Sequence, residues 1–331
     1  MSAELLTSLL RDVSRSFYLT MRILPGAIRP QISVAYLLAR ATDTIADTEL
    51  VSVAIRLESL SALRERILGA SAAPLNFGLL AQGNALPGER ILLERIEEVL
   101  RLLEQFSEAD RARIRDVLRI IISGQELDLR RFGDSKPGTL IALETEEELD
   151  DYTYRVAGCV GEFWTQLCRA HLFPQASLDD ELLLRNGIRF GKGLQWVNIL
   201  RDIPRDLRLG RCYMPRQSLA ALGLSPNDLL SADTQLRFRP LYDEYLNQAE
   251  GHLAAGWDYT NALPPGQARL RLACAWPILI GARTIQQLRQ GNVLDGSRRL
   301  KVGRRAVYAM MGRSVLLLAW PAGWRSQFRH E

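Results

Sequence analysis

The chain has 331 residues, of which 47% are hydrophobic and 24% are charged, and this balance excludes a disordered protein. The 42 cationic and 38 acidic side chains leave a formal net charge of +4, which argues against a nucleic-acid partner. Only Lys136, Lys192 and Lys301 are lysines, so arginine dominates the cations and would suit an anionic ligand wherever several converge.

Apolar residues recur at helical spacing in long blocks that are separated by glycine and proline breakers. The blocks span residues 31–68, 91–106, 108–131, 145–172, 180–202, 236–260, 267–290 and 304–320. The alternation that indicates strands is almost absent, no repeat is visible, and no shift in composition marks a boundary. We therefore predict a single all-α domain over residues 1–331.

The cysteines, histidines and chain ends bear on redox state and membrane attachment. The four cysteines form no CxxC pair and the three histidines no HExxH motif, so we expect reduced thiols and no zinc site. The charged N-terminus lacks a signal peptide's apolar core. The stretch from Ser314 to Trp324 falls short of the roughly 20 residues that span a bilayer. It predicts a terminal core helix in a soluble, cytoplasmic protein without a transmembrane segment, and a peripheral membrane contact is the alternative.

Two pairs of aspartates stand out because each pair is spaced four residues apart within a helical block. The first is Asp43 and Asp47, and the second is Asp202 and Asp206. Carboxylates at this spacing lie on one helix face with their Cβ atoms about 6 Å apart, and they repel unless a cation lies between them. A solvated surface pair is the alternative for either motif taken alone.

Further polar residues extend each aspartate pair into a stripe through otherwise apolar surroundings. Tyr36 and Arg40 precede the first pair at helical steps, and Gln195 and Asn198 precede the second pair in the same way. Buried polar stripes are costly unless they satisfy one another, so we expect the two stripes to face each other. Their oxygen ligands would then suit Mg²⁺.

Arginines accompany both stripes; they are Arg15, Arg40, Arg201, Arg205, Arg208 and Arg211. Guanidinium groups bind phosphate oxygens in a bidentate manner. Because the chain has neither a P-loop nor a kinase signature, we expect a magnesium-assisted departure of diphosphate that leaves a carbocation. Aromatic faces and helix dipoles would shield such a cation.

Four ordered motifs resemble those of the squalene/phytoene synthase family of head-to-head isoprenoid synthases, and the match covers most of the chain. They are SRSF at residues 14–17, YLLARATDTIAD at 36–47, YTYRVAGCVG at 152–161 and QWVNILRDIPRDLRLGRCYMP at 195–215. The resemblance implies the all-helical isoprenoid synthase fold, with helices around a central apolar cavity. It also implies a prenyltransferase that condenses two prenyl diphosphates through a presqualene-type cyclopropyl intermediate.

The resemblance implies a role for each residue that matches a motif. The catalytic Mg²⁺ ligands would be Asp43, Asp47, Asp202 and Asp206. The diphosphate would be held by Arg15, Arg40, Arg201 and Arg211. The substrate site would also be lined by Ser14, Ser16, Phe17, Tyr36, Val156, Gly161, Gln195 and Asn198.

Tyr152 matches the family's catalytic tyrosine, which is thought to guide proton loss in the first half-reaction. A core tyrosine with a satisfied hydroxyl is the alternative. Gly158 and Gly161 follow in the same helical block, where each glycine costs about 1 kcal/mol relative to alanine. Close approach to a prenyl chain and packing against a neighbouring helix are both open explanations for these glycines.

The chain departs from the family's pattern within both aspartate motifs. Ala46 and Arg205 stand where the family often carries glutamate, so each site has fewer carboxylates. Pro204 removes the helical hydrogen bond to Leu200. The helix therefore either ends at this proline or bends there and redirects Asp206.

Two late segments bear on a second cofactor. Residues 273–277 (ACAWP) resemble a pocket-lining segment of squalene synthases, and residues 298–303 (RRLKVG) resemble their basic segment associated with NADPH. The resemblance therefore implies NADPH, and the cofactor-binding residues would be Arg15, Arg40, Arg201, Arg299 and Lys301. A solvated basic loop is the alternative.

These observations together predict a squalene synthase acting on small-molecule prenyl diphosphates. It would couple two farnesyl diphosphates through presqualene diphosphate and then reduce the intermediate with NADPH. The first alternative is a dehydrosqualene or phytoene synthase, which omits the reduction. A non-catalytic prenyl-diphosphate-binding protein is a weaker alternative, because it would not need both aspartate pairs and Tyr152.

Overall fold

Helices account for 78% of the computed structural model, which confirms the all-α prediction. The structure describes residues 2–14, 18–48, 51–82, 86–133, 140–296 and 300–330. It comprises two compact units, Met1–Gly133 with Phe163–Gln175, and Asp134–Glu162 with Ala176–Glu331. That these form a single domain stays a prediction.

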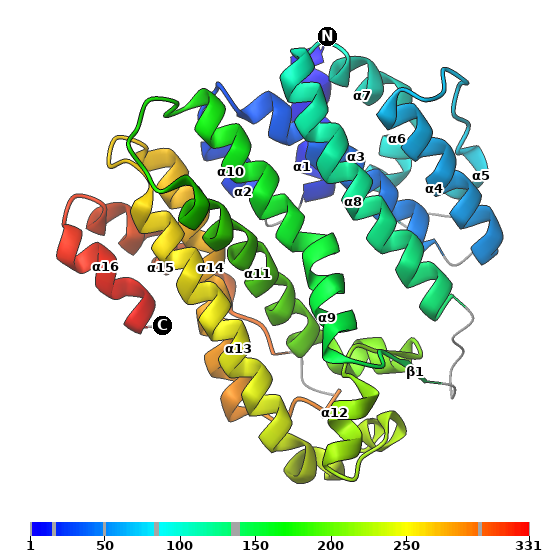
Figure 1. Cartoon of the computed structure of the whole chain (residues 1–331), viewed down its shortest axis with the longest axis vertical. Helices are drawn as coiled ribbons and strands as arrows, with labels where there is room; N and C mark the ends of the chain where they lie inside the picture. Colours follow the sequence, from blue (N-terminus) through cyan, green and yellow to red (C-terminus); the bar gives the residue numbers. More distant parts are fainter. Residues whose placement is uncertain are drawn as a thin grey trace. The chain divides into compact units, whose positions relative to one another are not determined.

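The first unit is built mainly from the N-terminal helices. These are α1 (Ser2–Ser14), α2 (Tyr18–Ile23), α3 (Arg29–Asp47), α4 (Val53–Leu68), α5 (Gly78–Gln82), α6 (Pro87–Glu94), α7 (Ile96–Leu103) and α8 (Glu108–Phe132). α3 packs against α4, α7 and α8 (Figure 1). Leu37, Leu38 and Ile45 of α3 are fully buried in this packing, so the helix that carries the first aspartate pair is anchored along its apolar face.

Two predicted helical blocks of this unit are interrupted, which corrects the sequence-based expectation. Residues 31–68 form α3 and α4, because Thr48 has extended backbone and the Ser52 hydroxyl accepts a hydrogen bond from Ile55 N to cap the new helix. Residues 91–106 divide into α6 and α7 at Arg95, whose backbone leaves the helical region. Apolar periodicity continues across both breaks because the helices on either side bury a face.

The second unit contains the long helices of the chain. Its elements are β1 (Ile141–Ala142), α9 (Glu146–Thr153), the π-helix η2 (Tyr154–Gly158), the first residues of α10 (Cys159–His171), α11 (Asp180–Arg208), β2 (Arg211–Cys212), α12 (Arg216–Ala221), the 3₁₀ turns η3 (Pro226–Leu230) and η4 (Ala232–Thr234), α13 (Gln235–Ala262), α14 (Ala268–Gln290), α15 (Arg304–Leu317) and α16 (Pro321–His330). α11 and α13 lie side by side, and α14 packs on both (Figure 1). α11 therefore has an apolar support along much of its length.

A two-residue parallel bridge joins β1 to β2. Ile141 pairs with Arg211 and Ala142 with Cys212. Gly210, which follows the end of α11, has φ of +78° and so turns the chain from the helix into β2 at a position that favours glycine. The bridge ties the start of α9 to the segment that follows α11.

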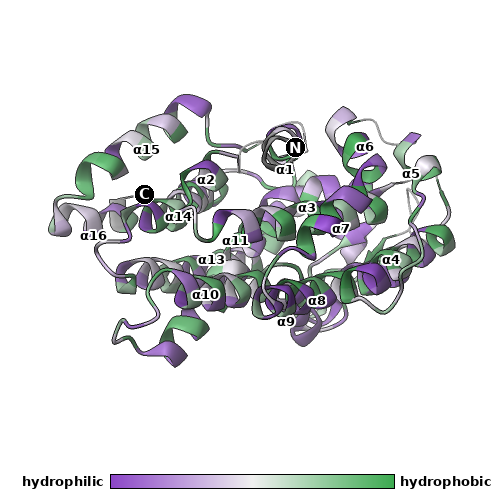
Figure 2. Cartoon of the chain, turned by 90° about the horizontal axis from the view of Figure 1, so that it is seen from above, coloured by the Kyte–Doolittle hydropathy of each residue, from purple (hydrophilic) through white to green (hydrophobic). Residues whose placement is uncertain are grey.

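The C-terminal stretch was expected to be a core helix, and this prediction is wrong for its first half. Val315, Leu316 and Trp320 are 50%, 80% and 62% exposed, whereas Trp324 is 1% exposed. α15 ends at Leu317 and α16 begins at Pro321, so the stretch is divided between two helices. In Figure 2, α15 combines hydrophobic and hydrophilic stretches beside α14 and α16.

Among the described residues, no helix has the length and apolar character needed to span a bilayer.

All four cysteines are buried and none is in a disulfide bond, as expected from their wide spacing. Burial raises the pKa of the Cys159 and Cys212 thiols to about 12. These two thiols are therefore protonated at neutral pH and unsuited to nucleophilic catalysis.

Candidate active site

The first aspartate pair lies on α3, with both carboxylates on the predicted helical stripe. The Asp43 side chain is 49% exposed, and Asp47 is exposed. Gln125 Nε2 of α8 donates a hydrogen bond to Asp43 Oδ1, and Arg40 Nη1 lies 3.9 Å from Asp43 Oδ2. Although half of the side chain is exposed, desolvation of the carboxyl group and the charge of Asp47 raise the pKa of Asp43 to about 6. A cation between the two carboxylates would relieve this repulsion.

Arg40 adds a cationic group to the same stripe. Its Nη2 forms an ion pair with Glu89 of α6, and the Glu89 side chain is 10% exposed. Its Nε is buried and makes no hydrogen bond. Arg40 is therefore held in place by one carboxylate while one of its donors remains unused.

The hydroxyl groups upstream of this stripe are engaged with α1. The Ser14 hydroxyl donates to the Leu10 carbonyl oxygen within α1, and the Tyr36 hydroxyl donates to Val13 O at 3.5 Å. Ser14 is 3% exposed. The Tyr36 contact therefore joins α3 to the last turn of α1, where the SRSF motif begins.

Two polar partners in the first unit, Gln125 and Glu89, were not predicted from the sequence. Gln125 lies on the buried stripe of α8, three or four residues from Ile121, Ile122 and Leu129, and it is 7% exposed. A lone amide on an apolar stripe was the signal that could have found it. No comparable pattern marks Glu89.

The second polar stripe lies on α11, as predicted. Asn198 Nδ2 donates to Gln195 Oε1 at 3.4 Å. Arg201 Nε donates to Asp202 Oδ1 at 2.9 Å, and its Nη2 also contacts the carboxylate. This hydrogen bonding raises the pKa of Arg201, to which the charge of Asp206 also contributes. The second stripe is therefore partly neutralised by its own arginine.

Pro204 does not end the helix, which settles one of the two possibilities left open by the sequence. α11 continues through this residue to Arg208, so Asp202 and Asp206 belong to one helix. Arg205 and Arg208 are exposed. Arg205, which replaces the glutamate expected from the family pattern, therefore points a cation rather than a carboxylate toward solvent.

Tyr152 lies beside the end of the second motif. Its ring stacks on Tyr213 with a centroid separation of 4.7 Å and an interplanar angle of 27°. Tyr213, Asp206 and Arg211 line one small cavity. The β1–β2 bridge and the turn at Gly210 place these residues near α9. Tyr213 was within a quoted motif but was not predicted as a site residue.

The glycines of the central motif pack against α11, which supports the second of the two explanations that the sequence left open. A Cβ at Gly161 would overlap the Gly187 carbonyl oxygen, and a Cβ at Gly191 would overlap the Ala157 carbonyl oxygen. At Gly158 a Cβ would come within 3.2 Å of Lys192 Cγ. Helix packing is therefore sufficient to explain these glycines. Val156 lies in the π-helical turn η2 and is partly exposed.

Several expectations fall outside what the structure describes. Arg15, Ser16, Phe17 and Arg299 lie outside the described residues. Lys301 is exposed just before α15. Because the aspartate pairs belong to different units, the facing of the two stripes stays a prediction.

The donor chemistry of each aspartate pair fits Mg²⁺. Within the described residues, no group of three or more His, Cys, Asp or Glu side chains forms a metal-binding cluster. Mg²⁺ keeps several waters and binds through one or two carboxylates together with substrate phosphates. Desolvation of the Asp43 carboxyl and the charge of Asp47 raise the pKa of Asp43 in spite of Arg40 and Gln125, so a bound cation would stabilise its charged form. Both carboxylate oxygens of Asp202 accept hydrogen bonds from Arg201, and each has a further lone pair that could bind a metal ion.

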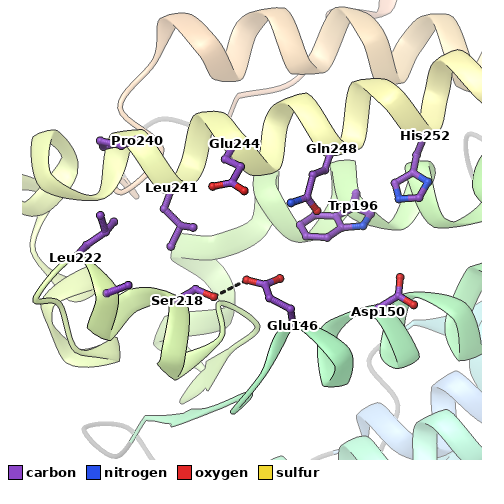
Figure 3. Close-up of a pocket in the computed structure, with 11 residues that line it drawn as sticks. Glu146, Asp150, Trp196, Ser218, Leu222, Pro240, Leu241, Glu244, Gln248 and His252 are labelled. Atoms are coloured by element: carbon purple, nitrogen blue, oxygen red, sulfur yellow. Dashed lines mark hydrogen bonds between the residues drawn. The ribbon is translucent and has the colours of Figure 1, made fainter.

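A larger pocket of about 530 Å³ lies elsewhere in the second unit, between α9, α12 and α13 (Figure 3). Glu146, Asp150 and Glu244 contribute carboxylates to it, and Ser218 donates a hydrogen bond to Glu146. His252 also lines it, and burial with the charges of Arg189 and Lys192 lowers its pKa to about 4. The lining contains no arginine and none of the predicted site residues, so this pocket does not suit diphosphate.

Comparison with protein families gives a match over nearly the whole chain. Residues 10–306 match the family described as squalene/phytoene synthase. A presqualene diphosphate synthase from Zymomonas mobilis is 30% identical over 253 residues, which cover 76% of this chain and 74% of that protein. A bifunctional lycopene cyclase/phytoene synthase from Aspergillus oryzae is 34% identical over 194 residues. That match covers 57% of this chain and 32% of the relative, and a further bifunctional relative is covered over 48% of its length.

Comparison with solved structures supports the same fold. The structure of TcSQS in complex with a ligand superimposes with a TM-score of 0.78 at 20% identity. The match covers 99% of this chain and 95% of that chain. The helical isoprenoid synthase architecture expected from the sequence is therefore confirmed at the level of fold.

Proposed function

Because the chain belongs to the squalene/phytoene synthase family, we propose that it couples two farnesyl diphosphates head to head through presqualene diphosphate and reduces the intermediate to squalene with NADPH. The family and the similar proteins are isoprenoid prenyltransferases, and the chain is an enzyme of this class. Family members use a divalent metal, Mg²⁺, for diphosphate ionisation. The substrates, the product and the reduction step belong to the proposal.

The observation that carries the proposal is the pairing of carboxylates with arginine on α3 and on α11. Asp43 and Asp47 share a helix stripe with Arg40, and on α11 the Arg201 side chain hydrogen-bonds to Asp202 and lies near the charge of Asp206. When bound, Mg²⁺ neutralises negative charge that develops on the departing diphosphate. A structural role alone would not require two such charged stripes on helices whose other faces are buried.

The arginines would orient the diphosphate. The unused Nε of Arg40 is a donor that a phosphate oxygen would satisfy. The Arg201 guanidinium donates to Asp202 in this structure. A phosphate oxygen would compete with Asp202 for these donors, and the guanidinium would then bind the phosphate while it stays close to the carboxylates. In this assignment the chain holds the leaving group through side chains that are already positioned by helix packing.

Tyr152 would guide proton loss as the carbocation rearranges to the cyclopropyl intermediate. Its ring is held by stacking on Tyr213, which restricts the directions in which its hydroxyl can point. The electron-rich faces of both rings would also stabilise a nearby carbocation. The name of the Zymomonas mobilis relative, a presqualene diphosphate synthase, supports this first half of the reaction.

A second candidate function is a phytoene or dehydrosqualene synthase, which would form the cyclopropyl intermediate but would not use NADPH. The names of the bifunctional relatives, which include phytoene synthase, favour this candidate. The resemblance of residues 298–303 to a basic NADPH-associated segment favours squalene synthase. Both forms of the second candidate differ from the proposal in using no reductant, and a phytoene synthase would differ also in taking a longer prenyl chain.

One set of incubations separates these candidates. The full chain is supplied with farnesyl diphosphate and Mg²⁺, with and without NADPH, and in parallel with geranylgeranyl diphosphate, and the extracted products are identified by mass spectrometry. Squalene formed only with NADPH supports the proposal. Presqualene diphosphate that accumulates even with NADPH contradicts the reduction step, and phytoene or dehydrosqualene formed regardless of NADPH supports the second candidate instead.

A further inference from the structure

One side of α15 is anchored to the second unit, and this fixes which side faces outward. α15 packs on α14 and α16. Met310 and Ser314 are its buried residues. Trp276 Nε1 of α14 donates to the Ser314 hydroxyl oxygen at 2.9 Å. A buried hydrogen bond of this kind sets the rotation of α15 about its axis.

The outward side of α15 carries large apolar side chains. Tyr308, Val315 and Leu316 are 60%, 50% and 80% exposed, and Trp320, just beyond the helix, is 62% exposed. These four account for about a third of the large apolar side chains with high exposure among the described residues, yet they lie within 13 residues of each other. Apolar exposure that is concentrated in this way indicates a contact surface.

Arginines border this apolar group. At 100° per residue, Arg305 falls between Tyr308 and Leu316, and Arg313 lies on the flank next to Leu316. Both arginines are exposed, and within the described residues neither has an ion-pair partner. Residues 304–330 contain five arginines and no aspartate or glutamate, although the whole chain has nearly balanced charge. The surface is therefore apolar at its centre, with Arg305 and Arg313 beside the apolar side chains.

This combination fits a lipid surface better than a second protein chain. Amphipathic helices that lie in a membrane interface have aliphatic and aromatic side chains on one face and arginines beside them. The arginine stems extend along the apolar region while their heads reach the lipid phosphates. A second copy of this chain would bring its own Arg305 and Arg313 against the same surface, and like charges would repel.

We propose that the outward face of α15, formed by Arg305, Tyr308, Arg313, Val315 and Leu316 together with Trp320, binds the surface of an anionic lipid bilayer. The helix would lie in the plane of the interface, with its apolar side chains among the headgroups and upper acyl chains. Each arginine near such a surface contributes attraction that salt screens within a Debye length. The proposal does not depend on which prenyl product the enzyme makes.

The test measures co-sedimentation of the full chain with two kinds of vesicle. One contains equal parts of phosphatidylcholine and phosphatidylglycerol, and the other contains phosphatidylcholine alone. We expect at least about tenfold stronger binding to the anionic vesicles at low salt, because two arginines face the surface and each contributes about 1 kcal/mol of attraction. This preference should largely disappear at about 1 M salt, where the Debye length is about 3 Å.

Two variants and two matched controls assign the binding to α15. Arg305→Glu with Arg313→Glu should weaken binding to anionic vesicles by at least about tenfold, and Tyr308→Ser with Leu316→Ser should weaken it by a similar factor. Arg283→Glu is the control for charge because this arginine is exposed on α14. Leu236→Ser is the control for apolar surface, since Leu236 is 86% exposed on α13. Both controls should bind like the unaltered chain.

Several results would overturn the proposal. They are equal binding to both vesicle types, no binding to either, and undiminished binding by the α15 variants. A dimer that dissociates on Tyr308→Ser with Leu316→Ser would instead identify a second copy of the chain as the partner. Circular dichroism and thermal midpoints show whether each variant is folded. Product formation from farnesyl diphosphate in detergent tests the enzymatic function separately, so either conclusion can fail without the other.

Discussion

The Tyr242 hydroxyl donates a hydrogen bond to the Leu200 carbonyl oxygen at 3.3 Å. Pro204 lacks the backbone N–H that would normally bind this oxygen in a helix. Tyr242 is fully buried, and burial raises the pKa of its hydroxyl, so it remains a donor at any ordinary pH. A side chain of α13 therefore replaces the hydrogen bond that the proline removes, and α11 continues to Asp206.

This replacement predicts that Tyr242 and Pro204 are energetically coupled. Tyr242→Phe should lower the free energy of unfolding by about 1–3 kcal/mol, because a buried carbonyl oxygen loses its donor. In a Pro204→Ala background the restored N–H can bind Leu200 O, so the same change should cost clearly less. Denaturant unfolding of the four proteins in the cycle measures the coupling. An equal cost of Tyr242→Phe in both backgrounds would show that the hydroxyl does not serve this carbonyl.

A second prediction concerns the glycine contacts between the central motif and α11. Gly161→Ala should destabilise the protein by about 1–3 kcal/mol, because its Cβ overlaps the Gly187 carbonyl oxygen and the helices must move apart. Gly312→Ala is the matched control, since a Cβ there has no neighbour within 4 Å and alanine favours helix by about 1 kcal/mol. Thermal unfolding should therefore shift in opposite directions, and a neutral Gly161→Ala would refute the close packing.

The carboxylate pairs give a third prediction. Asp43→Ala and Asp202→Ala should each lower kcat by a factor of at least about 100, because charge on the departing diphosphate is then less well stabilised. Asp116→Ala is the control, since this aspartate of α8 has a 71% exposed side chain and lies outside the predicted motifs. Activity is followed by diphosphate release from farnesyl diphosphate. Near-normal turnover by folded variants would show that these aspartates do not bind the catalytic Mg²⁺.

Tyr152 is predicted to act through its hydroxyl, whereas Tyr213 is predicted to position it. Tyr152→Phe should keep the stacked ring and the stability of the protein but slow formation of the cyclopropyl intermediate. Tyr213→Leu removes a stacking contact of about 0.5–1.5 kcal/mol and should lower kcat less. Single-turnover product analysis with the two variants distinguishes these roles. If Tyr152→Phe gives an unchanged yield, its hydroxyl has no part in the reaction.

The contacts of the buried Asp110 carboxylate lead to a prediction for how the stability of the first unit depends on pH. It is 3% exposed and accepts hydrogen bonds from Gln31 at 3.2 Å, Arg113 at 2.9 Å and His171 at 2.8 Å. Burial alone would raise its pKa, but the hydrogen bonds from His171 and Gln31 outweigh burial and lower it. The carboxylate therefore stabilises the fold above its unfolded pKa of about 3.9, and this contribution is lost as pH falls through the folded value.

Asp110→Asn should accordingly lower the free energy of unfolding by about 1–3 kcal/mol near neutral pH. The difference from the unaltered chain should shrink in acid, once Asp110 is protonated in both states. Urea unfolding at several pH values measures this dependence, with the exposed Asp116→Asn as a control that should change stability by less than about 0.5 kcal/mol. A difference that is constant with pH would mean that charge on Asp110 does not matter.

The fold was predictable because long amphipathic helices leave a clear period in the sequence. α8, α13 and α14 begin and end within a few residues of the predicted blocks. The break between α3 and α4 was missed because a Ser52 cap and one extended residue leave no gap in apolar spacing. The exposed half of the C-terminal stretch was also missed, because periodicity reports an apolar face but not whether another element covers it.

The candidate site was predictable where chemistry lies within one helix. Spacing alone placed Asp202 and Asp206 on one face of a helix, and the structure has them both on α11. Partners from other helices could not be predicted from the sequence, because contacts such as that of Gln125 with Asp43 join residues 82 positions apart. Similarly, nothing in the sequence indicates that Tyr242 supports the carbonyl next to Pro204.

The N-terminal unit is built from two separate stretches of the chain, and this limits where the chain can be cut without loss of that unit. Phe163–Gln175 belongs with the N-terminal helices, although the segments on both sides of it belong to the other unit. Asp110 bonds to His171 within this returning segment. A single cleavage or truncation after Gly133 would therefore deprive the N-terminal unit of its returning segment, including His171. Gene fragments that express either half in isolation should yield unstable polypeptides, whereas co-expressed fragments have a route to reassembly.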